Sequence, residues 1–162
     1  MMNKTVFVVA ISLLAAAARA GAAAPPAESY ATELSRVYEA TQFIRAVKEG
    51  CDSAHKENAA ANAAAYNSWA KRHRAFLNEL DRRVMMLIHG ASTDEKDYAK
   101  NVGRYMGDVV QYREILKQDF LGGPADNVQR QCNEFPQYLK SAEADLPKRF
   151  AAELKSIRKR KL

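Results

Sequence analysis

The spacing of apolar residues along this chain is helical almost throughout, and no segment shows the two-residue alternation of a half-buried strand. Four long segments carry apolar residues three or four positions apart, so that each presents one apolar face. The first covers residues 28–49. The second covers residues 53–89, where the alternation of four and three is typical of a left-handed bundle. The pattern predicts an all-α protein.

Turn and cap residues predict where these helices begin and end. Gly50 and Gly90 are typical stop signals for the first two helices. Ser92 and Glu95 have the spacing of a capping box, in which each side chain satisfies a free backbone N–H of the other's turn, and they predict the start of the third helix. The Gly-Gly-Pro sequence at 122–124 predicts its end.

The fourth segment begins near Pro124 and contains two further prolines. Pro136 and Pro147 each remove a backbone hydrogen bond and crowd the preceding turn, so we expect a kink or break at both. Four amphipathic segments with short connections predict an antiparallel up-down bundle of about four helices over residues 28–146. Residues 147–162 are then a basic amphipathic C-terminal helix or tail.

The chain contains two cysteines, Cys51 and Cys132. Their separation excludes a thioredoxin-like redox motif, and two cysteines are too few for a four-cysteine zinc site. In the up-down order, the first helix finishes at the pole where the fourth begins, which brings both cysteines to one end of the bundle. We therefore predict one disulfide, with two reduced or intermolecular thiols as the alternative.

The N-terminus has the pattern of a secretory signal peptide. Lys4 is followed by an uncharged, largely apolar run at 6–18 and by an A-x-A-like site, which predicts cleavage after Ala20. A retained membrane anchor is disfavoured because the run is short for a membrane span. Residues 21–27 are then a flexible leader. The Ala-rich style of the segment suggests a bacterial protein that is periplasmic or secreted.

Charge is concentrated at the C-terminus. The full chain carries a formal net charge of +6. Residues 147–162 contain a single acid and the following seven bases: Lys148, Arg149, Lys155, Arg158, Lys159, Arg160 and Lys161. Such a segment can contact an anionic lipid surface or a polysaccharide. The alternative is a docked last helix with a basic end, which the helix dipole favours. Nucleic acid is disfavoured as a partner outside the cytoplasm.

Small residues recur every four positions on the third helix, at Ala99, Gly103 and Gly107. Each of the two glycines costs a helix interior roughly 1 kcal/mol relative to alanine. A small-residue groove at this position would let another backbone approach closely. The candidates are the chain's own leader or tail and a partner helix, and the alternative is that a stable bundle tolerates the glycines.

His73 and a row of tyrosines are candidates for a ligand pocket. His73 falls in the apolar stripe of the second helix, and Tyr98, Tyr105 and Tyr112 recur every seven residues on the third. Together they could line an aromatic cleft in the core, or His73 could ligate a haem. The alternative is ordinary packing, with the rings in the core and the hydroxyls at its rim.

No catalytic motif is present, and the three histidines lack the spacing of a metal site, so we predict no enzyme, no metal and no cofactor. The sequence instead favours an exported, non-catalytic helical protein that acts as an interaction or scaffolding module. Its expected partner is another protein. The alternatives are a binder of anionic lipid or polysaccharide through the C-terminal bases, and a small-ligand carrier. The sequence does not determine the oligomeric state.

Overall fold

The computed structural model of the protein describes residues 27–160, which form helices and no strand. The predicted signal peptide, nearly all of the predicted leader and Lys161 lie outside these residues. Along the described chain the elements are α1 (Ala27–Ala54), the 3₁₀ helix η1 (Lys56–Asn58), α2 (Ala59–Arg72), α3 (Arg74–Gly90), α4 (Glu95–Leu121), α5 (Ala125–Tyr138), α6 (Leu146–Arg149) and α7 (Ala151–Lys159). The all-α prediction is confirmed. The predicted count of about four helices and the up-down order are not confirmed.

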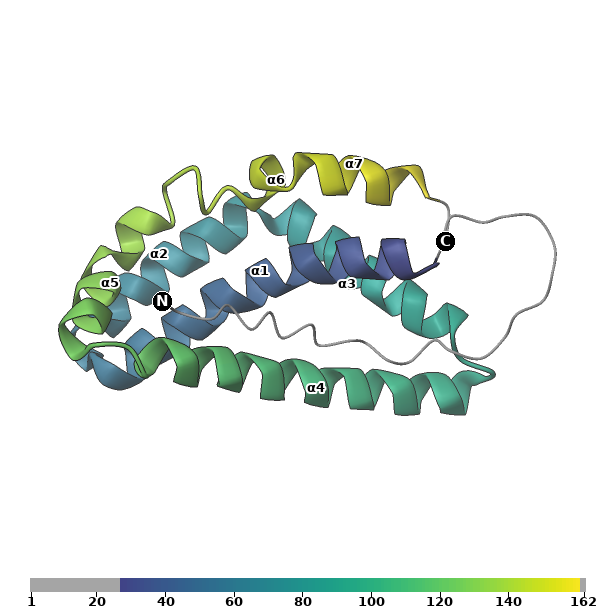
Figure 1. The fold of residues 1–162 in the computed structure, drawn as a ribbon, viewed down its shortest axis with the longest axis horizontal. Helices are drawn as coiled ribbons and strands as arrows, with labels where there is room; N and C mark the ends of the chain where they lie inside the picture. Colours follow the sequence, from purple (N-terminus) through teal and green to yellow (C-terminus); the bar gives the residue numbers. More distant parts are fainter. Residues whose placement is uncertain (1–26, 161–162) are drawn as a thin grey trace, which may run out of the picture.

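Helix α1 is the central helix of the fold, because all the other α-helices contact it. Figure 1 shows α1 crossing the middle of the molecule, with α4 along one side and α7 along the other. Its side chains are buried on several sides, as Leu34, Val37, Ile44 and Ala46 illustrate. This burial on more than one face explains why the neighbouring helices can pack around α1.

Ion pairs and ring contacts fix the direction of the helices beside α1. Tyr38 packs against Tyr105, with 6.0 Å between ring centroids, and Glu49 pairs with Arg113 at 3.1 Å. From the first of these contacts to the second, the residue number increases along both helices, so α1 and α4 run in the same direction. Helix α7 runs the opposite way, because Arg36 pairs with Glu153 while Glu33, nearer the start of α1, pairs with Arg160.

The disulfide between Cys51 and Cys132 is confirmed, with an S–S distance of 2.03 Å. It joins the last turns of α1 to the middle of α5. Neither cysteine has any exposed surface. The bridge therefore lies inside the core, and it holds together two helices that are 81 residues apart in sequence.

The predicted second helix is divided at His73, where the backbone dihedrals leave the helical range (φ −100°, ψ 12°). The backbone hydrogen bonds on either side persist, so α2 and α3 meet at a bend. Groups from the loop after α5 hold this bend. The Trp69 indole donates to the carbonyl of Ala144 at 2.8 Å, and Arg72 donates to the carbonyl of Leu139 at 2.9 Å. Such tertiary contacts are not visible in the heptad spacing.

Gly50 does not end the first helix, as its identity predicted, because α1 continues to Ala54. A Cβ atom at position 50 would lie 2.8 Å from the ring of Phe120 on α4. The glycine therefore allows α4 to approach α1 closely. Gly90, by contrast, is the last residue of α3, as predicted.

The cap of α4 lies two residues later than predicted. The Asp94 side chain accepts from the backbone N–H of Asp97 at 2.8 Å, and the Asp97 carboxylate accepts from the N–H of Thr93 at 3.0 Å. This reciprocal pair starts α4 at Glu95. The Ser92 hydroxyl instead donates to a carbonyl in the last turn of α3.

The chain leaves the α-helical conformation between the two prolines of the last segment. Pro136 lies in the last turn of α5, which ends at Tyr138, and residues 139–145 form turns and bends. Pro147 does not interrupt a helix but lies in the first turn of α6, where its missing N–H would have had no helical partner. The break expected at Pro147 is therefore absent, and the segment is interrupted instead at residues 139–145 and again at Phe150, between α6 and α7.

Candidate functional site: the outer face of helix α4

Helix α4 carries the most exposed apolar side chains of the described chain. Five large apolar side chains are at least 44% exposed, and three of them lie on α4: Met106 (52%), Val110 (55%) and Ile115 (50%). No residue of α4 is fully buried. A 27-residue helix without one buried side chain is held by a single side and leaves the rest of its surface to solvent.

The side of α4 that packs is the predicted stripe that includes Tyr98, Tyr105 and Tyr112, whose side chains are all partly buried. Tyr105 contacts Tyr38 of α1. Burial raises the pKa of both Tyr105 and Tyr112, and the carboxylate of Glu39 adds to the increase for Tyr112. Both phenols therefore remain protonated at ordinary pH and serve the contact with α1.

The predicted groove at Ala99, Gly103 and Gly107 is exposed along its length. A Cβ atom at Gly103 or Gly107 would meet no atom within 4 Å. The described part of the C-terminal segment does not cover these residues, and nearly all of the predicted leader lies outside the described range. Helical spacing places Met106 and Val110 beside the three small residues, so the exposed apolar side chains and the groove share one surface.

Three bases share this outer face. Lys96, Lys100 and Arg104 follow one another at intervals of four and are exposed, and none forms an ion pair with a described residue. Other bases of α4 are engaged: Lys117 pairs with Glu114 at 2.6 Å, and Arg113 pairs with α1. We name the surface formed by the three bases, the three small residues, Met106 and Val110 the α4 outer face. Only its small residues were predicted from the sequence, although the spacing of the bases was visible there.

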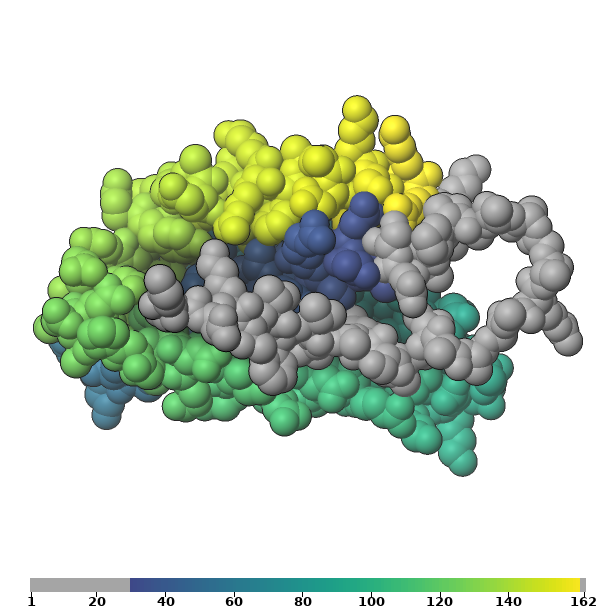
Figure 2. Space-filling model, in the orientation of Figure 1, coloured from purple at the N-terminus to yellow at the C-terminus, as the bar shows by residue number. Residues whose placement is uncertain are grey.

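The C-terminal segment is a docked helix. Phe150, Leu154 and Ile157 of α6 and α7 are buried in the same core as α1. Figure 2 shows this yellow segment packed directly against the purple start of α1. Its apolar side is therefore packed against the core of the protein.

Two of the predicted contact bases anchor this segment to the rest of the fold. Arg158 donates to both carboxylate oxygens of Glu79 on α3, at 2.6 and 3.0 Å. Arg83 also donates to Glu79, and it donates to the carbonyl of Ile157 at 3.2 Å. Both arginines hold the pKa of Glu79 below its ordinary value. Arg160 pairs with Glu33 at 3.6 Å.

The remaining predicted bases differ in their engagement. Lys148 pairs with Asp145 at 2.9 Å, and the guanidinium of Arg149 lies over the Phe150 ring, 5.2 Å from its centroid. Lys155 and Lys159 are exposed and have no ion pair with a described residue. The structure therefore does not gather the predicted bases into one free patch.

His73 and the tyrosine row do not share a pocket in the described structure. The His73 ring meets Trp69 edge-on at the α2–α3 bend, with 5.1 Å between centroids. Burial lowers the pKa of His73, and the nearby Asp145 opposes that shift. Tyr98 instead contacts His89, and Tyr105 contacts Tyr38. The core around these residues is packed by protein side chains.

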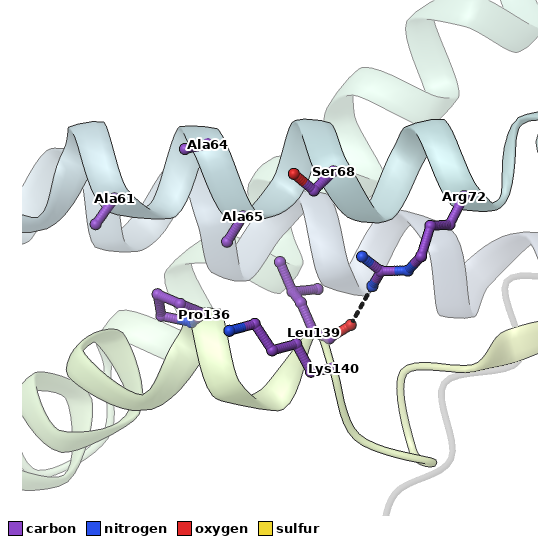
Figure 3. Close-up of a pocket in the computed structure, with 8 residues that line it drawn as sticks. All are labelled: Ala61, Ala64, Ala65, Ser68, Arg72, Pro136, Leu139 and Lys140. Carbon is purple, nitrogen blue, oxygen red and sulfur yellow. Dashed lines mark hydrogen bonds between the residues drawn. The ribbon is translucent and has the colours of Figure 1, made fainter.

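A shallow depression of about 310 Å³ lies between α2 and α5 (Figure 3). Its lining consists of Ala61, Ala64, Ala65, Ser68, Arg72, Pro136, Leu139 and Lys140. The guanidinium of Arg72 is already engaged with the carbonyl of Leu139. Because the depression is open and mostly lined by small side chains, it lacks the enclosure and convergent polar groups of a small-molecule site.

Within residues 27–160, no cluster of three or more His, Cys, Asp or Glu side chains could hold a metal ion. None of the described helices combines the length and apolar character needed to cross a membrane. Comparison with protein-family models, curated proteins and solved structures finds no match. A function must therefore be inferred from this chain's own surface, where the α4 outer face is the most prominent feature.

Proposed function

We propose that this protein is an exported, non-catalytic interaction module that binds another protein through the α4 outer face. The observation that supports this most directly is the exposure of Met106 and Val110 beside the open positions of Gly103 and Gly107. Apolar side chains that gather on one surface mark protein interaction sites more often than isolated ones do. Open glycines would let a partner helix approach the backbone of α4 closely.

The rest of the chain suits the role of a rigid support. The core around α1 and the buried disulfide fix one side of α4 and leave its other side accessible. Disulfides persist mainly in oxidising compartments. Together with the signal-peptide pattern at residues 1–20, the disulfide favours the bacterial periplasm or the cell exterior as the place of action.

Site-specific photo-crosslinking in the native host tests this proposal. A photoreactive amino acid at Gly107 should give a discrete crosslinked product, because nothing in the described chain covers this position. The matched control places the same amino acid at Asn78, an exposed position on α3. Equal products at both positions, or none at Gly107, would contradict the proposal.

A single substitution on the same face separates binding from folding. Val110→Glu should abolish the crosslink from Gly107, because it places a charge in the apolar part of the proposed contact. It should leave the melting temperature nearly unchanged, because Val110 is 55% exposed. Gln129→Glu on the exposed side of α5 is the control and should retain the crosslink.

A second candidate function is the binding of an anionic surface through Lys155 and Lys159, which are exposed and without an ion pair among the described residues. Co-sedimentation with anionic vesicles should then fall steeply with salt and be lost in Lys155→Gln/Lys159→Gln. Point substitutions are needed because removal of residues 147–162 would also delete the buried Phe150, Leu154 and Ile157. Co-sedimentation that changes neither with salt concentration nor in the doubly substituted protein would exclude this function.

A further inference from the structure

We infer that the segment bound by the α4 outer face is an acidic amphipathic helix of another protein, whose carboxylates pair with Lys96, Lys100 and Arg104. The inference rests on the proposed function, because it names the chemistry of the partner at the same surface. It is carried by two properties of that surface: its unpaired positive charge, and the exposed apolar side chains beside that charge.

The bases of this face form one exposed row on α4. Other exposed bases of the described chain also have no ion pair, among them Lys71, Arg82 and Lys140, but the three bases of α4 are the ones that lie beside the exposed Met106 and Val110. Their spacing of four keeps them along one strip of the helix. A row of acids at the same spacing on a partner helix would match them one to one.

The apolar part of the face requires the partner to be amphipathic. Met106 and Val110 are each more than half exposed, and each lies three residues after one of the two glycines, on the same surface of the helix. A helix docked along Ala99, Gly103 and Gly107 would cover both apolar side chains and bring its flank to the bases. Recognition of an amphipathic helix by an apolar surface with a charged edge is a recurrent binding mode.

A second copy of this chain fits the charge less well. A twofold contact between two antiparallel α4 helices uses the same surface on both copies, so the row of bases on one copy faces the same row on the other. The bases of one row would then approach the bases of the other, which like charges disfavour. Asp108 continues the row at the next interval of four and is exposed, so a second copy would offer a single acid of that row to three bases.

Two synthetic helical peptides of about 20 residues test the inference. Both carry an Ala/Leu seam. One has Glu every fourth position beside the seam, and the other has Lys at the same positions. The acidic peptide should shift the amide resonances of Gly103 and Gly107 in the isotope-labelled protein. In fluorescence anisotropy it should bind at least about tenfold more tightly than the basic peptide, and its binding should weaken with salt.

Charge reversal identifies the bases responsible. Lys96→Glu/Lys100→Glu/Arg104→Glu should weaken the acidic peptide about tenfold or more and strengthen the basic one. The matched control, Lys155→Glu/Lys159→Glu, changes the net charge in the same direction on α7 and should leave the α4 contact intact. Equal affinity for both peptides, or an equal loss in the control, would overturn the inference.

The outcomes also separate this inference from the proposed function. If Gly107 crosslinks to another protein and neither peptide shows a charge preference, the acidic partner is wrong and the interaction role stands. If Gly107 gives no crosslink and neither peptide binds, both fail. Sedimentation that shows a dimer abolished by Val110→Glu would replace the acidic helix with a second copy of the chain.

Discussion

Asn62 lies on the inner side of α2 with no exposed surface, and neither polar atom of its amide has a hydrogen-bond partner among the described residues. A buried polar group without a partner loses its hydration and gains nothing in return. The surrounding sequence, rich in alanine, gives no sign that this asparagine is buried while Asn67 is exposed. Only the packing of α2 determines which of the two enters the core.

We expect Asn62→Leu to stabilise the protein, because leucine has a similar size and removes the unpaired amide from the core. The free energy of unfolding, measured by urea denaturation, should rise by about 1–2 kcal/mol. Asn67→Leu on the exposed side of the same helix is the control and should change it by less than about 0.5 kcal/mol. A loss of stability in Asn62→Leu would show that the amide is paired in solution.

At the scale of helices, the sequence predicts what depends on local spacing and misses what depends on a neighbour. The apolar stripe of α4 and the stop at Gly90 were predicted, because side-chain periodicity and helix-ending residues act within one segment. Gly50 was misassigned because its role is set by Phe120, 70 positions later. The bend at His73 was missed because the loop after α5 imposes it.

The same limit applies to the candidate site. The small residues of α4 could be found from sequence, because a glycine in a helix interior is visible as an exception. Their exposure to solvent could not be predicted from the sequence, because it depends on which side of α4 packs against α1. For the converse reason, the choice between a free basic patch and a docked last helix could not be made from the sequence. The acid that binds Arg158 lies on α3, in another part of the sequence.

The two glycines of α4 lower the stability of this helix, and their replacement can be tested. Gly103→Ala and Gly107→Ala should each raise the free energy of unfolding by about 0.5–1 kcal/mol, since alanine favours the helix and the added methyl meets nothing. Thermal denaturation gives the measurement. Gly50→Ala is the matched contrast and should destabilise by about 1–3 kcal/mol, because its methyl would collide with Phe120. Destabilisation by Gly103→Ala would mean that α4 is covered in solution.

The attachment of α7 to α3 should depend on pH through Glu79. Hydrogen bonds from Arg158 and Arg83 lower the pKa of Glu79 from its ordinary value of 4.5. A carboxyl with a lowered folded pKa stabilises the fold above that ordinary value, and this contribution is lost as the pH falls through the folded pKa. Glu79→Gln should therefore reduce the free energy of unfolding by about 1 kcal/mol at neutral pH.

The pH profile distinguishes this ion-pair effect from a general packing defect. The difference in stability between the parent and Glu79→Gln should be constant at neutral pH and shrink below about pH 4.5, where the parent loses the same charge. Glu134→Gln, at an exposed position on α5, should match the parent at every pH. A difference that persists unchanged into acid would show that the charge of Glu79 does not hold α7.

At the scale of the whole molecule, the fold depends on segments that are distant in sequence and meet at α1. Helices α4 and α7 pack on different sides of α1, and the disulfide ties its last turns to α5. This arrangement makes α1 the support for the α4 outer face. A change that loosens the end of α1 should therefore weaken the packing of α4, which contacts α1 more than any other helix does.

The disulfide is the strongest test of that dependence. Closing a loop between residues 81 apart restricts the unfolded chain, and the chain-entropy model assigns about 4–5 kcal/mol to such a loop. Cys51→Ala/Cys132→Ala should therefore unfold at a much lower urea concentration than the oxidised parent and respond no further to reductant. Because both cysteines are fully buried, dithiothreitol should reduce the parent only at the rate at which the protein unfolds. Rapid reduction of the native protein, monitored by thiol alkylation, would show that α1 and α5 separate without global unfolding. In that case the end of α1, where Gly50 meets α4, is not a rigid support.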